Sequence, residues 1–524
     1  MTCPISMTPT ESGFAEASAA LERGDTEAAL AVLRQALEGD PQNALCHFQI
    51  GSILLDAGRQ EDAVAQFREA HRIDPNIAEF PLRIGMECAR QSLLDEAESS
   101  LQLALGFGPN NPAALSCLGD VYRRQGRVGE AIPLLEAARR LAPASVDVLS
   151  NLGIALQQAG HGDQAIAVFE EALRLHPSHP LVLNNLGMAL KQSGRIQEAL
   201  AHLNTALQVA PQFAEARLNR AMLLLLTGRF KEGWREYEAR PKWPVPDGQD
   251  LAAHLQAGLP LDNRTVLLHA EQGLGDLIQF VRYAKWLADR GAKVVVECPV
   301  RAHELMRGVP GVNGVVDTGA LPAEFDLNLR LLSLPGLVHP HAGFLDAGKS
   351  YMKVDPALVA PWAARLGPAT KVRAGIVWTG SPAHPNNSQR SIPLALLQPL
   401  LEHPRLELYS LQAGAGDAGL GPPERDWGRQ SLTDTAAIMM ALDLVITVDT
   451  MPAHLAGALG RPVWTLLSFV PDWRWGLESH TTPWYPTMKL FRQPKPGNFD
   501  SMVERIGSAV DEWTRDPLFP ESAR

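Results

Sequence analysis

Apolar and small residues follow two different patterns along the chain. Up to about residue 240, small residues recur at a fixed spacing typical of helix hairpins, whereas beyond residue 263 short apolar runs alternate with helical patterns. The clearest short run is Leu444 to Val448, which is rich in β-branched residues and predicts a buried parallel strand. A helix is expected directly after it, with Thr450 as N-cap, Pro452 in the first turn and Gly460 at its end.

A period of 34 residues governs the first part of the chain. Prolines keep this spacing six times, at Pro41, Pro75, Pro109, Pro143, Pro177 and Pro211. Three ladders of small residues keep it as well: Ala17, Gly51, Gly85, Gly119, Gly153, Gly187 and Ala221; Ala29, Ala63, Ala97, Ala131, Ala165 and Ala199; and Ala36, Ala70, Ala104, Ala138, Ala172 and Ala206. Small residues let the two helices of a hairpin cross closely, while proline ends one unit and starts the next. The array resembles tetratricopeptide repeats, with about six complete units and a seventh, modified unit from Ala214 to Arg240.

An asparagine recurs in the last repeats, at Asn151, Asn185 and Asn219. The resemblance implies a right-handed superhelix whose concave groove holds a peptide or protein, with these asparagines in a row along the groove. A carboxamide has both a donor and an acceptor, so it can hold a peptide backbone without reading its side chains. The protein O-GlcNAc transferase family uses such a ladder. The alternative is that asparagine is simply frequent at this position in generic repeats.

Alternating strand and helix patterns predict two lobes with parallel sheets after the repeats. The expected strands are 265–269, 293–298, 315–317 and 325–331 in the first lobe, and 372–378, 406–411, 444–448, 463–467 and 488–491 in the second. One helix is expected from about Leu277 to Gly291, and another from about Ser391. The fold class predicted is therefore α, a tetratricopeptide superhelix, followed by α/β with two Rossmann-like lobes.

The predicted boundaries are 10–240 for the superhelix, 241–262 for a linker, 263–366 for the N-terminal lobe and 367–515 for the C-terminal lobe. Trp234, Tyr237 and Trp243 lie close together before a proline-rich strip. An aromatic cap followed by such a strip would join a solenoid to the next domain.

Composition and charge exclude several classes of protein. Hydrophobic residues make up 46% and charged residues 20% of the 524 residues, as in an ordinary globular protein. The chain has no apolar run of about 18 residues and no basic, apolar start, so we expect a cytoplasmic protein without membrane insertion. Its five cysteines lack CxxC spacing, which favours neither disulfides nor zinc. Up to Arg240, 21 Lys and Arg stand against 29 Asp and Glu, which argues against a nucleic-acid partner.

Polar residues follow several of the expected strands, at the edge where open α/β sheets bind ligands. The Gly273-Leu274-Gly275-Asp276 turn follows the first strand, and its aspartate could also be a plain N-cap. The loop TGSPAHPNNSQRS offers phosphate-binding groups at Thr379, Ser381 and Arg390, although an ordinary surface loop is the alternative. Gln412, after the next strand, could meet a nucleobase or ribose.

The helix expected after Val448 begins beside further polar groups. Its free N–H groups and positive dipole end predict an anion site surrounded by Asp449, Thr450 and His454. The alternative is an ordinary βα unit in which Asp449 and Thr450 are caps. The later segment PDWRWGLESHTTPWYP gathers four aromatic residues around Arg474, either at a site or in the core.

Three of these motifs resemble the heptosyltransferase-like glycosyltransferases, whose two Rossmann-like lobes form the GT-B fold. They are GLGD at 273–276, the Arg390-Ser391 end of the long loop, and DTMPAHLAGALG at 449–460. The resemblance implies that Asp276 is the base, that Arg390 meets the donor phosphates and that Asp449, Thr450 and His454 bind the diphosphate. Gly275 would lie on the donor side as well. The chain departs from the pattern at Met451, where glycine is usual, and at Arg390, where lysine is usual.

Together with the repeats, the chain resembles bacterial proteins that join such a domain to tetratricopeptide units, including flagellin glycosyltransferases. This implies a metal-independent, inverting transferase that moves a sugar from a nucleotide sugar, as co-substrate and without a cofactor, to a hydroxyl of a protein acceptor such as flagellin. The N-terminal lobe would then serve the acceptor and the C-terminal lobe the nucleotide sugar. Two alternatives stay open: a lipid-linked or polysaccharide acceptor, and an inactive repeat scaffold, which Met451 favours.

Overall fold

The computed structural model of the protein describes residues 9–241, 249–320, 324–342, 350–368, 370–382, 384, 386–413, 425–428 and 430–515. The chain divides into two compact units, residues 1–190 and residues 191–524. The described part of the first unit is helical, and the second unit contains two parallel sheets. The predicted fold class, α followed by α/β, is confirmed. Trp243 of the expected aromatic cap lies outside the described residues.

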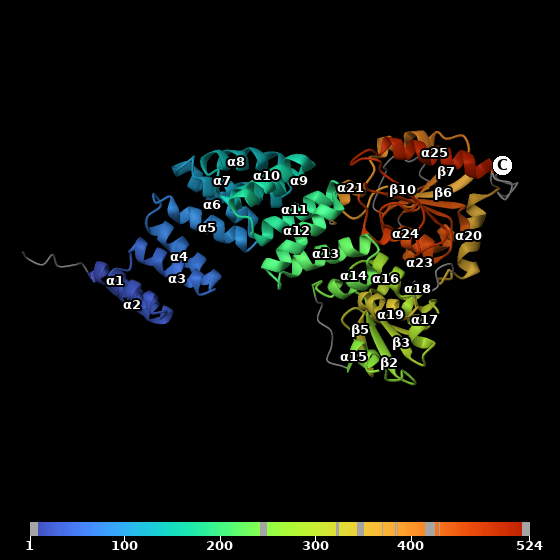
Figure 1. Ribbon diagram of the computed structural model, residues 1–524, viewed down its shortest axis with the longest axis horizontal. Helices are drawn as coiled ribbons and strands as arrows, with labels where there is room; N and C mark the ends of the chain where they lie inside the picture. The colour runs from blue at the N-terminus through green and yellow to red at the C-terminus, as the bar shows by residue number, and fades with distance from the viewer. Residues whose placement is uncertain are drawn as a thin grey trace, which may run out of the picture. The chain divides into compact units, whose positions relative to one another are not determined.

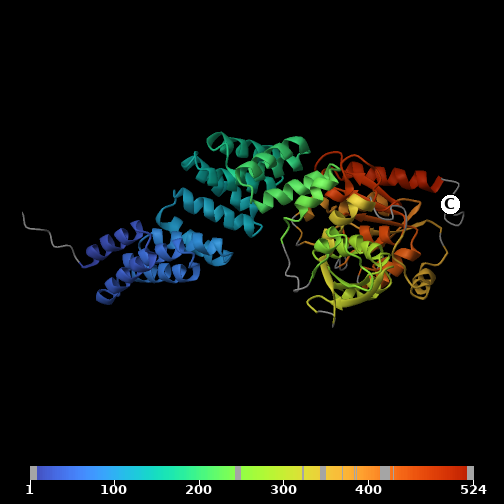
Figure 2. The same cartoon turned by 60° about the horizontal axis from the view of Figure 1, so that its bottom comes forward.

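Antiparallel helix hairpins follow one another in the first unit, as Figure 1 and Figure 2 show. They are α1 (Pro9–Glu22) with α2 (Thr26–Gly39), α3 (Ala44–Asp56) with α4 (Gln60–Ile73), α5 (Glu79–Arg90) with α6 (Leu94–Phe107), α7 (Pro112–Arg124) with α8 (Val128–Leu141), and α9 (Val146–Gln158) with α10 (Gly162–Leu175). Helix α11 (Pro180–Gln192) ends just inside the second unit, which continues with α12 (Ile196–Val209), α13 (Ala214–Leu226) and α14 (Phe230–Tyr237).

Close crossing of the paired helices explains the ladder of small residues. A Cβ atom added to Gly51, Gly85, Gly119 or Gly153 would lie 2.5–2.6 Å from the side chain of Phe67, Leu101, Leu135 or Phe169, respectively. Such separations are far below van der Waals contact, so only glycine fits. Alanines of the second ladder, such as Ala63 and Ala97, are fully buried. Each ladder proline follows the end of a second helix, and both predictions are confirmed.

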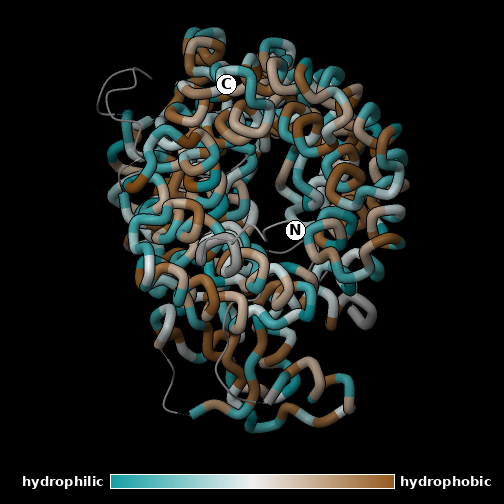
Figure 3. Tube along the Cα trace, turned by 90° about the vertical axis from the view of Figure 1, so that its left-hand side faces the viewer, coloured by the Kyte–Doolittle hydropathy of each residue, from teal (hydrophilic) through white to brown (hydrophobic). Residues whose placement is uncertain are grey.

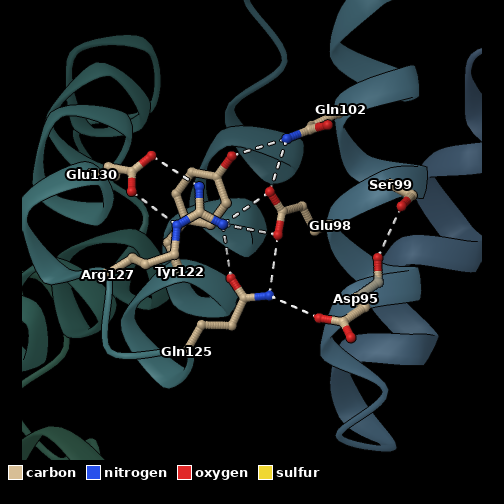
Figure 4. Close-up of polar contacts among 8 residues, drawn as sticks. All are labelled: Asp95, Glu98, Ser99, Gln102, Tyr122, Gln125, Arg127 and Glu130. Carbon is tan, nitrogen blue, oxygen red and sulfur yellow. Dashed lines mark hydrogen bonds and ion pairs between the residues drawn. The ribbon is translucent and has the colours of Figure 1, made fainter.

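Apolar residues recur along each repeat helix between polar ones, as the alternating brown and teal segments of Figure 3 show. The polar residues also join neighbouring repeats. Figure 4 shows Arg127, before α8, between Glu98 of α6 and Glu130 of α8, at 2.9 Å from each carboxylate. The guanidinium carbon of Arg127 lies 3.8 Å from the centre of the Tyr122 ring within the fourth repeat, and its ion pair with Glu98 ties the third repeat to the fourth.

The first sheet has the strand order β1-β5-β2-β3-β4, and all its strands are parallel. The strands are β1 (Gln249–Asp250), β2 (Thr265–His269), β3 (Lys293–Cys298), β4 (Val312–Asp317) and β5 (Leu327–Arg330). The helices of this lobe are α15 (Leu251–Gln256), α16 (Leu274–Phe280), α17 (Tyr283–Ala288), α18 (His303–Arg307) and α19 (Leu334–Ala342), with 3₁₀ turns η1 (Val300–Ala302) and η2 (Leu331–Ser333).

The second sheet has the order β10-β9-β8-β6-β7 and is also parallel. Its strands are β6 (Val372–Val377), β7 (Leu406–Ser410), β8 (Leu444–Val448), β9 (Val463–Leu467) and β10 (Met488–Arg492). Its helices are α20 (Pro356–Leu366), α21 (Asn387–Arg390), α22 (Gln398–Leu401), α23 (Leu432–Ala441), α24 (Met451–Ala458) and α25 (Asp500–Arg515), with 3₁₀ turns η3 (Leu394–Leu397) and η5 (Trp473–Trp475). The core lies between this sheet and α25, while α24 contacts β8 and β9 from the other side (Figure 1).

Two expected helices differ from the structure. The helix predicted from Leu277 to Gly291 is broken into α16 and α17, because buried Arg282 donates from Nε to the carbonyl of Gln279 at 2.8 Å and from Nη1 to Trp484 at 3.0 Å. The helix predicted from about Ser391 starts later, with η3 at Leu394 followed by α22, since Ser391 is extended and the next residue donates its N–H to the carbonyl of Trp378 at 2.8 Å. Helix α21 lies just before Ser391.

The end of the seventh repeat unit packs into both lobes. Trp234 makes edge-to-face contacts with Trp473 and Phe280, at centroid separations of 5.0 and 6.1 Å. Buried Arg240 forms a two-pronged ion pair with Glu271, which follows β2, at 3.0 and 2.7 Å. Aromatic packing and a buried ion pair therefore join α14 to the first sheet. Among the described residues, no helix is both long enough and apolar enough to span a membrane.

Candidate functional site

The strand order of each sheet reverses next to its central strand. In the second sheet the chain passes from β6 to β7 on one side and then to β8 on the other; in the first sheet it passes from β2 to β3 and later to β5. Open α/β sheets bind ligands at such a reversal, outside the carboxyl ends of the strands. The segments after β2, β6 and β8 carry the predicted polar residues, so they form the candidate site.

Arg390 lies at the end of α21 and reaches the carboxyl end of β8. Its Nη1 donates to the carbonyl oxygen of Asp449 at 2.8 Å, and its buried Nε has no hydrogen-bond partner among the described residues. A Cβ on Gly380 would lie 2.6 Å from Nη2, so the glycine leaves room for the guanidinium. Burial lowers the pKa of Arg390, and the carboxyls of Asp449 and Asp472 partly offset this. The guanidinium thus keeps unused donors beside the strand end, as an anion site requires.

The remaining loop residues mostly hold the backbone in place. The Thr379 hydroxyl lies 2.8 Å from that of Ser391, and Ser381 is exposed. The side-chain oxygen of Gln412 accepts from the N–H groups of Trp378 and Thr379 at 3.2 and 3.0 Å. Its carboxamide oxygen therefore fixes the end of β6, and the predicted contact between Gln412 and a nucleotide stays a prediction. Ala383 and Pro385 of this loop lie outside the described residues.

Helix α24 begins directly after the β8 strand end, as predicted, and the positive φ of Gly460 ends its last turn. Thr450 stands at the N-cap position but makes no side-chain cap; its hydroxyl donates to the carbonyl of Val448 at 3.2 Å. Thr450 is therefore the N-cap residue, as predicted, but its hydroxyl bonds to the strand end instead of to the helix N–H groups. The first N–H groups of α24 do not depend on Thr450 for a partner.

His454 lies where α24 packs against α16 of the first lobe. Its Nδ1 is 3.0 Å from the Tyr485 hydroxyl, and its ring stacks on Trp475 at 5.3 Å. A Cβ on Gly275 would lie 2.9 Å from His454 Cδ2, so glycine permits this contact between helices. Burial lowers the pKa of His454 to about 3, which keeps the imidazole neutral at physiological pH. Contact of His454 with a diphosphate stays a prediction, and any such contact would be made by a neutral ring.

Asp276 is joined to the second lobe through Arg474. One of its oxygens accepts from the Gly273 N–H at 3.1 Å, as in a helix cap, and the other accepts from Arg474 Nη2. Arg474 Nη1 also donates to Asp472 at 2.8 Å. Burial raises the pKa of Asp276, and Arg474 and the Gly273 N–H oppose the change. The carboxyl of Asp276 therefore caps α16. Its role as base stays a prediction, and a raised pKa is favourable for that role.

Asp449 completes a group of three carboxyls. Burial and the nearby charge of Asp472 raise the pKa of Asp449 to about 7, while Trp475, Arg474 and Arg390 oppose the change. Burial also acts to raise the pKa of Asp472, but Arg474 outweighs it and the net pKa is lowered. Neighbouring carboxyls with separated proton affinities are typical of functional sites.

Two members of this cluster were not singled out from sequence. Asp472 lies two residues before Arg474 in the segment PDWRWGLESHTTPWYP. The aromatic residues of this segment form a recognisable pattern, but its carboxyl belongs to no motif. Lys191, in the last turn of α11, faces Asp472. A lysine in a repeat helix carries no motif, so only the fold brings it to the cluster.

Two of the three asparagines predicted to line a groove bond to the preceding repeat. Asn151 donates to the Ser116 hydroxyl at 3.1 Å, and Asn185 donates to that of Ser150 at 3.4 Å. Both asparagines are half-buried, and Asn219 is buried. The equivalent bonds of Asn151 and Asn185 confer a shared orientation, and contact with an acceptor stays a prediction. In the part of the chain that the structure describes, no group of three or more His, Cys, Asp or Glu residues could hold a metal ion.

Comparison with known families bears on both parts of the chain. Residues 10–222 match the family described as Cilia and flagella-associated protein 70 C-terminal domain, and residues 190–255 match Tetratricopeptide repeat. Residues 427–495 match Glycosyltransferase family 9 (heptosyltransferase), and this range contains β8, α24 and Arg474. The chain therefore combines tetratricopeptide repeats with a region that matches glycosyltransferase family 9.

Individual proteins and solved structures resemble the chain at low sequence identity. Protein FlbA of Caulobacter vibrioides is 26% identical over 335 residues, which cover 54% of this chain and 52% of FlbA. The chain thus spans about half the length of this curated relative. The solved tetratricopeptide-repeat protein YrrB is 22% identical to this chain. The match covers 35% of this chain and 95% of YrrB, with a TM-score of 0.30. A solved tetratricopeptide-repeat protein from Parabacteroides merdae is 15% identical to this chain. The match covers 44% of this chain and 91% of that protein, with a TM-score of 0.40.

Proposed function

We propose that the protein transfers a sugar from a nucleotide-sugar donor to a hydroxyl group of a protein acceptor that the repeats hold. The family 9 match supports glycosyl transfer. The observation that carries the donor assignment is the guanidinium of Arg390, which keeps a buried Nε without a partner in the described structure, beside the start of α24. A nucleotide sugar supplies the diphosphate that such a group would bind.

Transfer needs a base for the acceptor and stabilisation of the departing nucleoside diphosphate. Asp276 would take the proton of the acceptor hydroxyl as the oxygen attacks the anomeric carbon from the face opposite the leaving group. Arg390 and the N-terminal end of α24 would stabilise the negative charge on the departing diphosphate. This assignment needs no metal, and it inverts the configuration at the anomeric carbon because there is one displacement.

The acceptor assignment rests on the repeats. Tetratricopeptide hairpins stack into extended surfaces that suit a polypeptide. Asn151 and Asn185 make equivalent bonds to Ser116 and Ser150, which supports a regular array of carboxamides along the first helices. Flagellin is the acceptor that the resemblance to flagellin glycosyltransferases suggests. The sugar and the nucleotide are not specified by these residues.

The experiment that tests this function is a transfer assay read by intact-protein mass spectrometry. The purified chain is incubated with flagellin and a panel of nucleotide sugars, and a gain of one or more sugar masses is expected. Asp276→Asn should bind the donor nearly as well as the parent and transfer about 10²–10⁴-fold more slowly, since it lacks the base. Near-parental turnover in that variant would leave Asp276 with its capping role alone.

A further inference from the structure

The last turn of α11 lies against the segment that follows β9. A Cβ on Gly194, just beyond α11, would lie 2.9 Å from Cε1 of Phe469. Three residues before Gly194 stands Lys191, and three residues after Phe469 stands Asp472, whose carboxyl interacts with the charge of Lys191. Helix α13 also packs against η5, the turn that begins just after Asp472. Repeat helices therefore bring Lys191 to the same cluster as Arg474.

The ammonium group of Lys191 has no fixed partner in the described structure. Its side chain is half-buried, yet it makes no hydrogen bond or ion pair with a described residue. Asp472, the carboxyl whose charge acts on Lys191, is held by Arg474 at 2.8 Å instead. A partly desolvated cation normally pairs with a carboxylate, so an unpaired one is suited to a ligand anion.

The charges of the cluster show what Lys191 adds. The cations are Lys191, Arg390 and Arg474, and the carboxyls are Asp276, Asp449 and Asp472. Burial and the charge of Asp472 raise the pKa of Asp449, which reduces the negative charge that this carboxyl carries at neutral pH. Burial lowers the pKa of both neighbouring histidines, His384 and His454, so they add little positive charge. With Lys191, three cations face the three carboxyls; without it, two cations would face the same three.

A doubly or triply charged diphosphate needs cations that can contact it, and Lys191 is a cation that no carboxylate of the described structure holds. Burial lowers the pKa of Lys191, and Asp472 opposes the change. A bound diphosphate would favour the ammonium form further. Resting on the proposed transferase function, we infer that Lys191 binds the diphosphate of the nucleotide-sugar donor, so that a residue of the sixth repeat completes the donor site.

The test is calorimetric titration of the full chain with UDP, GDP, ADP, CDP and TDP, followed by variants with the diphosphate that binds most tightly. Lys191→Ala should weaken binding by at least about tenfold, the effect of losing one charge-assisted hydrogen bond. Lys191→Arg should restore most of the affinity because it keeps the charge. Lys231→Ala, at an exposed lysine on α14, is the matched control and should bind like the parent.

Titration with the matching nucleoside, which has no phosphate, separates ligand binding from a purely structural role. The inference requires that Lys191→Ala lowers diphosphate affinity much more than nucleoside affinity, at an unchanged melting temperature. Equal losses for both probes, or parental diphosphate affinity in Lys191→Ala, would overturn it. If the parent binds diphosphate and only Arg390→Ala loses it, the inference about Lys191 fails and the donor site stands. If the parent binds none of the five, the proposed function and this inference fail together.

Discussion

At the scale of single residues, the site consists of buried charged groups that the fold pairs only in part. Arg390 bonds to a backbone carbonyl of β8 and keeps its buried Nε without a partner among the described residues. Asp449 lies near Asp472, and its pKa is raised to about 7. Such arrangements cost stability in the free protein, and a bound anion would relieve part of the cost at Arg390.

The raised pKa of Asp449 predicts that this residue lowers the free energy of unfolding by an amount that depends on pH. An aspartate in an unfolded chain has a pKa near 4, whereas Asp449 has one of about 7, so the folded state binds more protons between these values. The free energy of unfolding therefore falls as the pH rises from about 4 to about 7. Asparagine carries no charge at any pH. Asp449→Asn should raise the melting temperature relative to the parent, and more so at pH 8 than at pH 5.5, as measured by differential scanning fluorimetry.

Comparison of variant and parent at each pH is needed because His454 acts in the opposite direction. Its pKa of about 3 lies below that of a free histidine, so it lowers stability as the pH falls below about 6.5. Asp56→Asn, at an exposed aspartate of α3, should show no such pH-dependent gain. A gain for Asp449→Asn that is the same at both pH values would contradict the burial of this carboxyl.

Sequence reasoning found the residues of the site that belong to motifs but not the contacts among them. Arg390, Asp449 and Thr450 were found because strand ends and helix starts are local patterns. The pairing of Asp276 with Arg474 joins residues 198 positions apart, and no local pattern reports on it. The contact of Gln412 was also missed: its side-chain oxygen accepts from the N–H groups of Trp378 and Thr379, which follow β6 and would otherwise lack an acceptor.

At the scale of elements, the contact between α16 and α24 holds the two lobes at the site. Gly275→Ala would place a Cβ 2.9 Å from Cδ2 of His454 and near the backbone of Met451. We expect a loss of about 1–3 kcal/mol in the free energy of unfolding, typical of overpacking, together with weaker donor binding. Chemical denaturation and diphosphate titration measure the two effects.

Gly106→Ala is the matched control for that substitution. Gly106 lies inside α6, and a Cβ there would meet no atom within 4 Å. Alanine should therefore stabilise this helix by about 0.5–1 kcal/mol. If Gly275→Ala were also stabilising, the close contact between α16 and α24 would not exist in solution.

The asparagine row carries the prediction for the repeat elements. The triple variant Asn151→Ala, Asn185→Ala, Asn219→Ala should weaken binding of a protein acceptor by about 0.5–1.5 kcal/mol per lost hydrogen bond. Diphosphate affinity should stay at the parental value, and the loss should appear in the acceptor KM more than in kcat. Steady-state transfer to full-length acceptor measures it. Equal kinetics for the variant and the parent would remove the ladder from acceptor recognition.

The elements themselves were largely predictable, with two clear exceptions: β1 and α15 belong to the first lobe although they lie within the predicted linker 241–262, and one predicted helix is broken. The repeat hairpins follow from a period that places glycine or alanine wherever two helices cross, as at Gly85 and Gly119. The break between α16 and α17 was missed because Arg282 bonds to Trp484 and to the Tyr351 hydroxyl, both distant in sequence. A helix pattern read from neighbouring residues cannot include such contacts.

At the scale of the whole molecule, the second unit combines repeat helices with both sheets. Arg240 and Trp234 of the seventh repeat pack against Glu271, Phe280 and Trp473. The central proposal is that the strand reversal of the second sheet binds the diphosphate of a nucleotide sugar, with Arg390 as part of that site.

Calorimetric titration of nucleotide sugars into the parent, Arg390→Ala and the exposed control Arg235→Ala tests this claim most directly. The account predicts that at least one nucleotide sugar binds the parent and the control equally. Arg390→Ala should bind it about 1.5–3 kcal/mol more weakly, the contribution of a charge-assisted hydrogen bond. Equal affinity in the parent and Arg390→Ala, or no binding of any nucleotide sugar to the parent, would contradict the account.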